Sequence, residues 1–231
     1  MKRKIDRTVL RVMTLMLVTL LPARVLSQEI VFVVHADPVI SWMGSNESEY
    51  AGEGARPGFD IGLNVLQYFA DNYAISTGIS IMSAGCRQSV SEDHKMVFTN
   101  FEQVVPAGDE IRYNLKYMNI PAGVRLQTNQ VGYFTYFTDM GFDIRMLLKS
   151  TVDLPTLQIN HENGKNEVYG LNAGWHVGGG IEYELPIDAS IIAGLSYAQD
   201  FFDVTKDLRD VYQHHDRSTV RMVRFRLGLK F

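Results

Sequence analysis

The sequence predicts an all-β fold: an eight-stranded antiparallel up-and-down transmembrane β-barrel, preceded by a cleaved signal peptide. Three observations support this prediction. The final segment alternates strictly between apolar and polar residues, seven earlier segments share the alternation, and the connections between them are long and short in turn. Outer-membrane barrels combine these properties, because each strand faces lipid on one side and a polar interior on the other.

The alternation is clearest in residues 218–231. Apolar side chains recur at every second position and end on an aromatic residue: Val223, Phe225, Leu227, Leu229 and Phe231. Arg224, Arg226, Gly228 and Lys230 lie between them. Successive side chains of a strand point to opposite faces, so one face is hydrocarbon and the other carries three cations. We expect Phe225, Leu227, Leu229 and Phe231 to form the signal for the barrel-assembly machinery. An amphipathic edge strand of a soluble sheet is the alternative.

The amino-terminal residues predict export. Lys2, Arg3, Lys4 and Arg7 form a basic region, residues 12–21 are almost wholly apolar, and short side chains follow at 25–27. This order is typical of a secretory signal peptide, here residues 1–27. A membrane-spanning helix needs about 20 apolar residues, so the run is too short to be an anchor. Residues 28–231 then form the barrel domain.

Composition narrows the function classes. Residues 1–27 hold six of the 22 basic and one of the 26 acidic residues, which leaves 16 basic and 25 acidic residues and a net charge of −9. This balance argues against a nucleic-acid partner, which requires a basic patch. The single cysteine, Cys86, excludes an intramolecular disulfide, and we expect it to be an incidental free thiol at the edge of a loop.

Eight strands are expected, in chain order, at about 30–43, 58–67, 73–83, 111–126, 130–148, 170–185, 189–202 and 218–231. Short turns are expected at 70–72, 128–129 and 186–188. Long polar connections are expected at 44–56, 84–110, 149–169 and 203–217. In outer-membrane barrels the long connections are extracellular and the short turns periplasmic.

Each strand has one apolar face, which we expect to contact lipid. Examples in chain order are Ile40, Ile61, Ile79, Val124, Phe142, Ile181 and Leu195. The opposite faces carry glycines and charges: Asp37, Asp60, Arg125, Asp139, Asp143, Arg145, Glu182, Glu184, Arg224, Arg226 and Lys230. An eight-stranded barrel has room for side chains but not for a channel. Buried charges must be paired, so we expect a closed polar lumen with a structural charge network.

The chemistry-bearing residues leave two classes of function open. The first is a non-enzymatic barrel that displays loops or docks with envelope machinery. The second is a lipid or peptide hydrolase at the extracellular rim, for which Asp210, His214, His215 and Asp216 are the best local group. His35 and His176 are expected to join the internal network. The chain has no Gly-x-Ser-x-Gly, His-Glu-x-x-His or phosphate-loop motif, so we predict no catalytic residue, metal site or cofactor.

Three stretches carry a family resemblance. Residues 117–126 read YMNIPAGVRL, residues 58–64 read GFDIGLN, and residues 225–231 read FRLGLKF. Together they resemble the PorT-like outer-membrane β-barrel family of Bacteroidetes. The resemblance implies the outer membrane of a Gram-negative bacterium and contact with its lipid. It also implies an envelope or secretion-complex partner, since some relatives serve type IX secretion and gliding. It brings no catalytic set.

Overall fold

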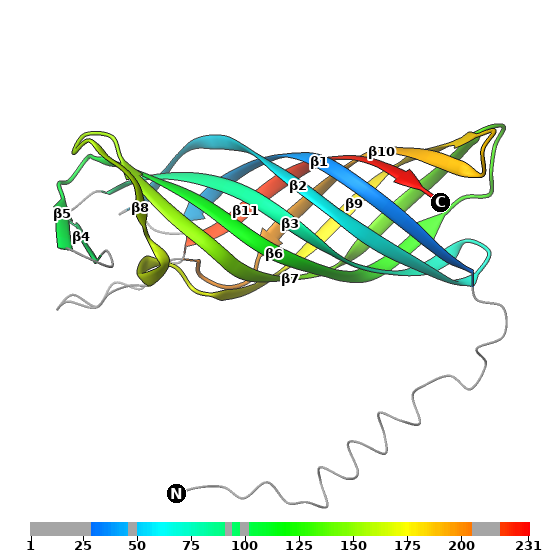
Figure 1. Cartoon of the computed structure of the whole chain (residues 1–231), viewed down its shortest axis with the longest axis horizontal. Helices are drawn as coiled ribbons and strands as arrows, with labels where there is room; N and C mark the ends of the chain where they lie inside the picture. The colour runs from blue at the N-terminus through cyan, green and yellow to red at the C-terminus, as the bar shows by residue number, and fades with distance from the viewer. Residues whose placement is uncertain (1–28, 46–49, 91–93, 98–101, 205–217) are drawn as a thin grey trace, which may run out of the picture.

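The described residues form one closed antiparallel β-barrel (Figure 1). This structure, a computed structural model, describes residues 29–45, 50–90, 94–97, 102–204 and 218–231. The wall strands are β1 (Ile30–Ser45), β2 (Tyr50–Ala70), β3 (Tyr73–Val90), β6 (Glu110–Gln127), β7 (Phe134–Leu154), β9 (Leu171–Leu185), β10 (Ala189–Asp200) and β11 (Ser218–Lys230). Each pairs with the next wall strand, and β11 pairs with β1 to close the cylinder. The predicted eight-stranded antiparallel up-and-down barrel is therefore confirmed.

Short connections gather at one end of the barrel, which we call the turn end (Figure 1). Residues 71–72, 128–133 and 186–188 make these turns, at the three predicted places. The middle connection is longer than predicted. Val131 forms an isolated bridge with Phe134, and Gly132 takes a positive φ of 66°, so β7 begins at Phe134 and not at residue 130.

The opposite end, the loop end, contains more regular structure than the sequence predicted. Much of the polar segments 44–56, 84–110 and 149–169 is strand, because β1, β2, β3 and β7 all continue into them. A hairpin of β4 (His94–Val97) and β5 (Glu102–Val105) follows β3. Strand β8 (Ile159–Asn163) pairs with the end of β7, and the 3-10 turn η1 (Lys165–Glu167) follows it. Residues 205–217 and the predicted signal peptide, 1–27, lie outside the described residues.

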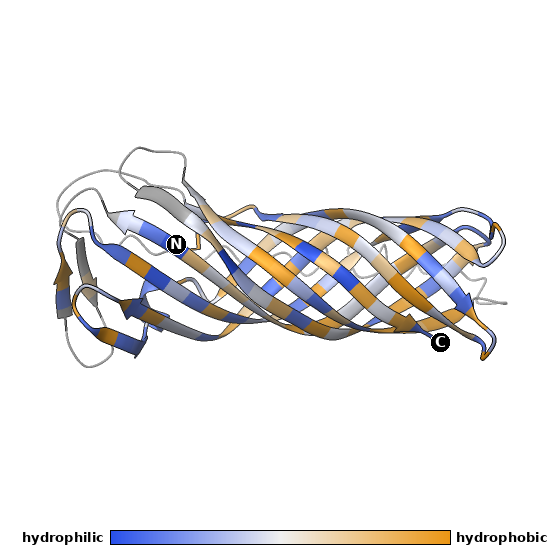
Figure 2. Cartoon of the chain, turned by 90° about the horizontal axis from the view of Figure 1, so that it is seen from above, coloured by the Kyte–Doolittle hydropathy of each residue, from blue (hydrophilic) through white to orange (hydrophobic). Residues whose placement is uncertain are grey.

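The two faces of the wall differ over most of its length, as Figure 2 shows by the alternating colours along the strands. Ile61, Ile181 and Leu227 point outward and are 54%, 37% and 50% exposed. Asp37, Asp60 and Asp143 point inward and are 0% exposed. We call the outward apolar surface the apolar band. Among the described residues, no helix is long and apolar enough to cross a membrane.

Near the loop end the polarity of the wall inverts. Along β6, Ile111, Tyr113, Leu115 and Tyr117 point inward and are buried, with Arg112, Asn114 and Lys116 on the outer face. From Met118 onward the same strand instead turns Ile120 and Val124 outward, and Asn119 and Arg125 inward. A wall with polar residues outside and apolar residues inside suits water. The loop end is therefore built like a small water-soluble β-domain.

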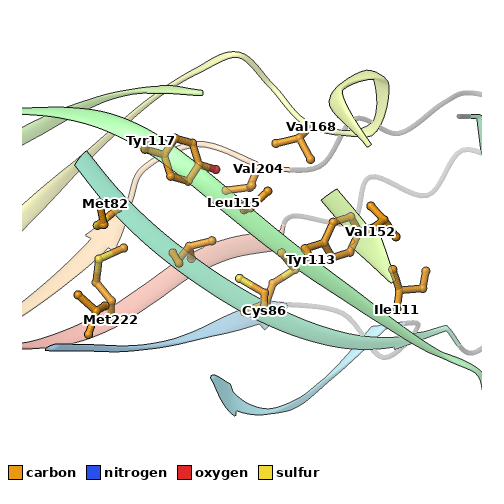
Figure 3. Close-up of a cluster of buried hydrophobic side chains, with 14 of the residues drawn as sticks. Met82, Cys86, Ile111, Tyr113, Leu115, Tyr117, Val152, Val168, Val204 and Met222 are labelled. Carbon is orange, nitrogen blue, oxygen red and sulfur yellow. The ribbon is translucent and has the colours of Figure 1, made fainter. Parts of the chain in front are cut away.

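This inverted region encloses its own hydrophobic core (Figure 3). Inward side chains of the wall supply most of it, including Met82, Cys86, Leu115, Tyr117, Val152 and Met222. Met96 of β4 and Val105 of β5 close it from the hairpin, together with Val168 and Val204. Two predictions are thereby wrong. The interior is not polar throughout, and Cys86 is not at a loop edge, because continued β3–β6 pairing places it in this core at 0% exposure.

Candidate functional site

The predicted charge network lies in the middle of the barrel, between two apolar clusters. The loop-end core described above lies on one side. On the other, Val31, Val33, Leu66, Tyr68, Ala74, Phe137 and Ile192 form a smaller cluster near the turn end. Most of the charges are thus enclosed by side chains from both ends, whereas Lys230 is partly exposed toward the turn end. They divide into two groups, one centred on Arg125 and one on Asp143.

Arg125 of β6 organises the first group. Its Nε and Nη2 donate to the two carboxylate oxygens of Asp139 at 2.8 and 2.9 Å, and its Nη1 donates to Glu182 Oε1 at 2.7 Å. The guanidinium carbon lies 4.1 Å from the centroid of the Phe137 ring. A bidentate carboxylate and an aromatic face are the two contacts that a planar guanidinium makes best.

Glycines make room for this arrangement. Phe137 pairs in register with Gly180, and a Cβ built on Gly180 would lie 2.8 Å from the Phe137 ring. The Phe137 ring therefore occupies space that only a glycine at position 180 leaves free. In this position the face of the ring contacts the Arg125 guanidinium. A similar close approach occurs at Gly62, where a Cβ would lie 2.8 Å from His35 Nε2.

Asp143 of β7 organises the second group. Its Oδ2 accepts hydrogen bonds from Arg145 Nη2 at 2.8 Å and from Arg224 Nη2 at 2.9 Å. Its Oδ1 lies 3.1 Å from His176 Nδ1. Arg224 also lies 3.5 Å from Asp60, and Arg145 pairs with Asp200.

Strand β11 joins the two groups to the first strand of the barrel. Arg226 Nη1 donates to Asp139 Oδ2 at 2.6 Å, and its Nε lies 3.8 Å from Asp37. Asp37 in turn accepts from the Leu227 backbone N–H at 2.9 Å and lies 3.1 Å from His35 Nδ1. Lys230 pairs with Glu182. The network therefore ties β1, β2, β6, β7, β9, β10 and β11 together through side chains.

The structure places most of the predicted network residues in this interior. Those buried or partly buried with ion-pair partners are Asp37, Asp60, Arg125, Asp139, Asp143, Arg145, Glu182, Arg224, Arg226 and Lys230. Glu184 is different: it is exposed at the turn end and accepts a hydrogen bond from Gln130. Asp200 takes its place as the sixth acid. The alternation of β10 puts Asp200 inward with Ser196, and that signal could have identified it.

The predicted assembly residues lie on the outer face of β11. Phe225, Leu227, Leu229 and Phe231 are 42%, 50%, 50% and 59% exposed. Beyond the end of β11, the Phe231 backbone exchanges two hydrogen bonds of 2.9 Å with Phe32, and the two rings stack with centroids 6.4 Å apart. Phe231 therefore continues the seam between the first and last strands.

The described side chains of the network form ion pairs and hydrogen bonds with one another. No group of three metal-ligating side chains occurs within the described residues. The rim candidates Asp210, His214, His215 and Asp216 all lie outside that part of the chain. His35 and His176, expected as network members, each contact an aspartate inside the barrel.

A sheet closed on itself satisfies every wall hydrogen bond internally, and an apolar band around a polar interior is what a bilayer requires of it. These properties define an integral outer-membrane β-barrel. The chain belongs to the outer membrane protein beta-barrel domain family, whose model matches residues 33–206. In outer-membrane barrels the short turns are periplasmic and the long loops extracellular, so we expect the turn end to be periplasmic and the loop end extracellular. The match is to the general family, and the PorT-like resemblance stays a prediction.

Solved barrels share this outline. They include Neisserial surface protein A, at 12% identity and a TM-score of 0.46, with 86% of this chain and 95% of that chain covered. OprG from Pseudomonas aeruginosa has 12% identity and a TM-score of 0.44, with 88% of this chain and 97% of OprG covered. The outer membrane protease OmpT from Escherichia coli has 8% identity and a TM-score of 0.40, with 90% of this chain and 99% of OmpT covered. No curated protein matches the sequence. Likeness at this level carries no information about activity.

Proposed function

We propose that the chain is a non-enzymatic outer-membrane barrel with a closed lumen, whose loop end is a docking platform for another envelope protein. The observation that supports this proposal is the separate hydrophobic core of the loop end. We call this region the extracellular cap. It comprises β4, β5, β8, η1 and the loop-end parts of β2, β3, β6 and β7.

A folded cap favours recognition of another protein. Flexible loops lose conformational freedom when they bind, and a preorganised surface avoids much of that cost. Polar contacts fix the outer face of the cap: Arg112 Nε donates to Glu110 at 2.9 Å, and Asn114 Nδ2 donates to Asp153 at 2.9 Å. The His161 backbone N–H also donates to Asp153, at 2.6 Å, and so holds β8 against the wall.

The lumen supports the closed, non-conducting part of the proposal. Arg125, Arg145 and Asp143 are 1%, 0% and 0% exposed. The hydrogen bonds from Arg125 to Glu182 and from Arg224 to Asp143 join strands that are not neighbours in the wall, so they cross the interior. A solute would have to break these pairs in order to pass. The resemblance to PorT-like proteins favours a secretion or gliding complex as the partner, and the barrel-assembly machinery as the route of insertion.

Photo-crosslinking in living cells tests the docking role. A photoreactive residue at Val104, which is 50% exposed on β5, should yield one discrete adduct with an envelope protein. The matched control is Leu195, which is 54% exposed on the apolar band and should crosslink only lipid. Absence of a discrete adduct at Val104, or the same adduct at both positions, would contradict the proposal.

Two further measurements address the alternatives. Stable conductance of the purified barrel in planar bilayers would contradict the closed lumen. Turnover of phospholipid or peptide that is lost in a His214→Ala/His215→Ala variant would establish the rim hydrolase instead.

A further inference from the structure

Two lysines face each other on the outer surface of the barrel. Lys116 of β6 and Lys149 of β7 are direct partners in the strand register, and both side chains are exposed. Directly opposed residues of an antiparallel pair have Cβ atoms about 4.5–5.5 Å apart, and like charges there destabilise the sheet. Within the part of the chain that the structure describes, neither ammonium forms an ion pair.

A β-bulge creates this juxtaposition. The register passes from Lys116–Lys149 to Tyr117–Leu147, so Leu148 is an extra residue in β7. On one side of the bulge Asp143 and Arg145 face inward, whereas on the other side Val152 does. Uninterrupted alternation would have continued the inward series at odd positions and sent Lys149 into the barrel. Bulges re-aim side chains in this way.

A second like-charged pair, in the cap, has an acidic residue beside it. Arg87 of β3 and Arg112 of β6 are also opposed in register. Glu110 lies against both, 2.9 Å from Arg112 Nε and 3.4 Å from Arg87 Nε. The hydrogen bond from Arg112 lowers the pKa of Glu110, so this carboxylate keeps its charge to a lower pH than an ordinary glutamate. Among the described residues, an acid therefore lies against one pair and not against the other.

The lysine pair lies where the polarity of the wall inverts. The next outward register pair toward the turn end is Met118–Met146, and Leu148 lies beside Lys149. Met146 and Leu148 are 42% and 44% exposed. Two cations therefore border hydrocarbon at the extracellular edge of the apolar band. A phosphorylated lipid would complement the two cations with its phosphate and the methionines with its acyl chains.

We propose that Lys116 and Lys149 bind the phosphate of a phosphorylated glycolipid in the outer leaflet, with its acyl chains against Met118, Met146 and Leu148. This site rests on the outer-membrane placement of the barrel and is independent of the docking role of the cap. The bulge is then the structural device that assembles the site.

Binding to vesicles tests the proposal directly. The full folded barrel is placed in phosphatidylcholine vesicles with added bisphosphorylated lipid A, and the urea midpoint of unfolding reports association. Bisphosphorylated lipid A should raise the midpoint of the natural protein. Lys116→Gln/Lys149→Gln should weaken apparent association about thirty-fold, from the contribution of two surface cations. Lys116→Arg/Lys149→Arg should keep the shift.

A control variant and two control ligands show whether the lysine pair and the lipid-borne phosphate are both required. Arg87→Gln/Lys165→Gln also removes two cations and should respond to lipid A like the natural protein. Dephosphorylated lipid A and millimolar inorganic phosphate should give no shift. In phosphatidylcholine alone, the double glutamine variant should be no less stable than the natural protein, because a repulsive pair is gone. An undiminished lipid A shift in that variant, or an equal shift with inorganic phosphate, would overturn the proposal. Neither result bears on docking by the cap.

Discussion

Replacing Arg125 with methionine is the sharpest test of the closed lumen. The guanidinium makes three charge-assisted hydrogen bonds, to Asp139 and Glu182, and contacts the Phe137 ring at 4.1 Å. Breaking a buried ion pair by removing one partner costs about 3–5 kcal/mol, because the other charge is left uncompensated. Methionine is shorter, since its terminal methyl reaches only about as far as the arginine Nε, and a sulfur contact with the Phe137 ring would return about 0.3–1.5 kcal/mol.

The acids left behind keep some compensation. Asp139 still accepts from Arg226 at 2.6 Å, and Glu182 still pairs with Lys230. We therefore expect Arg125→Met to lower the free energy of unfolding by about 4 kcal/mol, in the middle of the range for a broken buried pair. Arg226→Met should cost less, because Asp139 keeps both hydrogen bonds from Arg125.

Reversible urea unfolding in phosphatidylcholine vesicles measures these differences, with fluorescence from the two tryptophans, Trp42 and Trp175, as the signal. Lys165→Met at an exposed position is the control and should stay within about 0.5 kcal/mol of the natural protein. Combining Arg125→Met with Asp139→Asn should cost less than the two single losses added together, because the two residues share one interaction. A loss below about 1 kcal/mol for Arg125→Met would mean that water solvates the lumen charges, contrary to a closed interior.

Four further predictions concern the membrane, the seam and the cap. Leu227→Arg should lower the free energy of unfolding in lipid by about 2–4 kcal/mol near the midplane, whereas Leu227→Met should be neutral; equal stability of the two would mean that the face is wrongly assigned. Deleting Phe231 should reduce the heat-modifiable barrel recovered in membranes and increase degraded chain, because the Phe32 hydrogen bonds and the assembly signal are lost; unchanged recovery would remove its assembly role. Cys86 should react with a maleimide only after denaturation, whereas a Cys86→Ser chain with Thr156→Cys should react when folded; fast labelling of Cys86 would show that the cap core is open. Fractionation should recover the chain in the outer membrane without residues 1–27, and a soluble periplasmic product would contradict the barrel.

The sequence predicts the membrane-spanning wall well, because period-two alternation directly reports which face meets lipid. Ile61 and Asp60, or Leu227 and Arg226, are separated into outward and inward positions by that pattern alone. Alternation does not report depth along the barrel, however. Glu184 shares the inward series with Glu182, yet it lies at the open turn end and is exposed.

The cap could not be recognised from the same pattern. Residues 84–90 of β3 mix small and polar side chains, and they read as a loop in isolation. Their strand conformation depends on pairing with β6 and on the core that Met96 closes from the hairpin after β3. The bulge at Leu148 also shifts the alternation of β7, so that a continuous pattern is broken where two environments meet. The pairing and the core closure are long-range effects. Within β6 the sequence does carry a local sign of the cap, because the apolar series moves from odd to even positions at Tyr117 and Met118.

The inversion of polarity along β6 also fixes how deep the barrel lies in the bilayer. A shift of two residues along a strand tilted by about 40° moves the wall by about 5 Å along the membrane normal. Such a shift toward the periplasm would carry Lys116 and Lys149 into hydrocarbon, and the reverse shift would bring Met118 and Met146 into water. Both directions are unfavourable, so the vertical position of the barrel is set within one such step. Any partner would then meet the cap at a constant height above the outer leaflet, and a mechanism that slides the barrel like a piston is disfavoured.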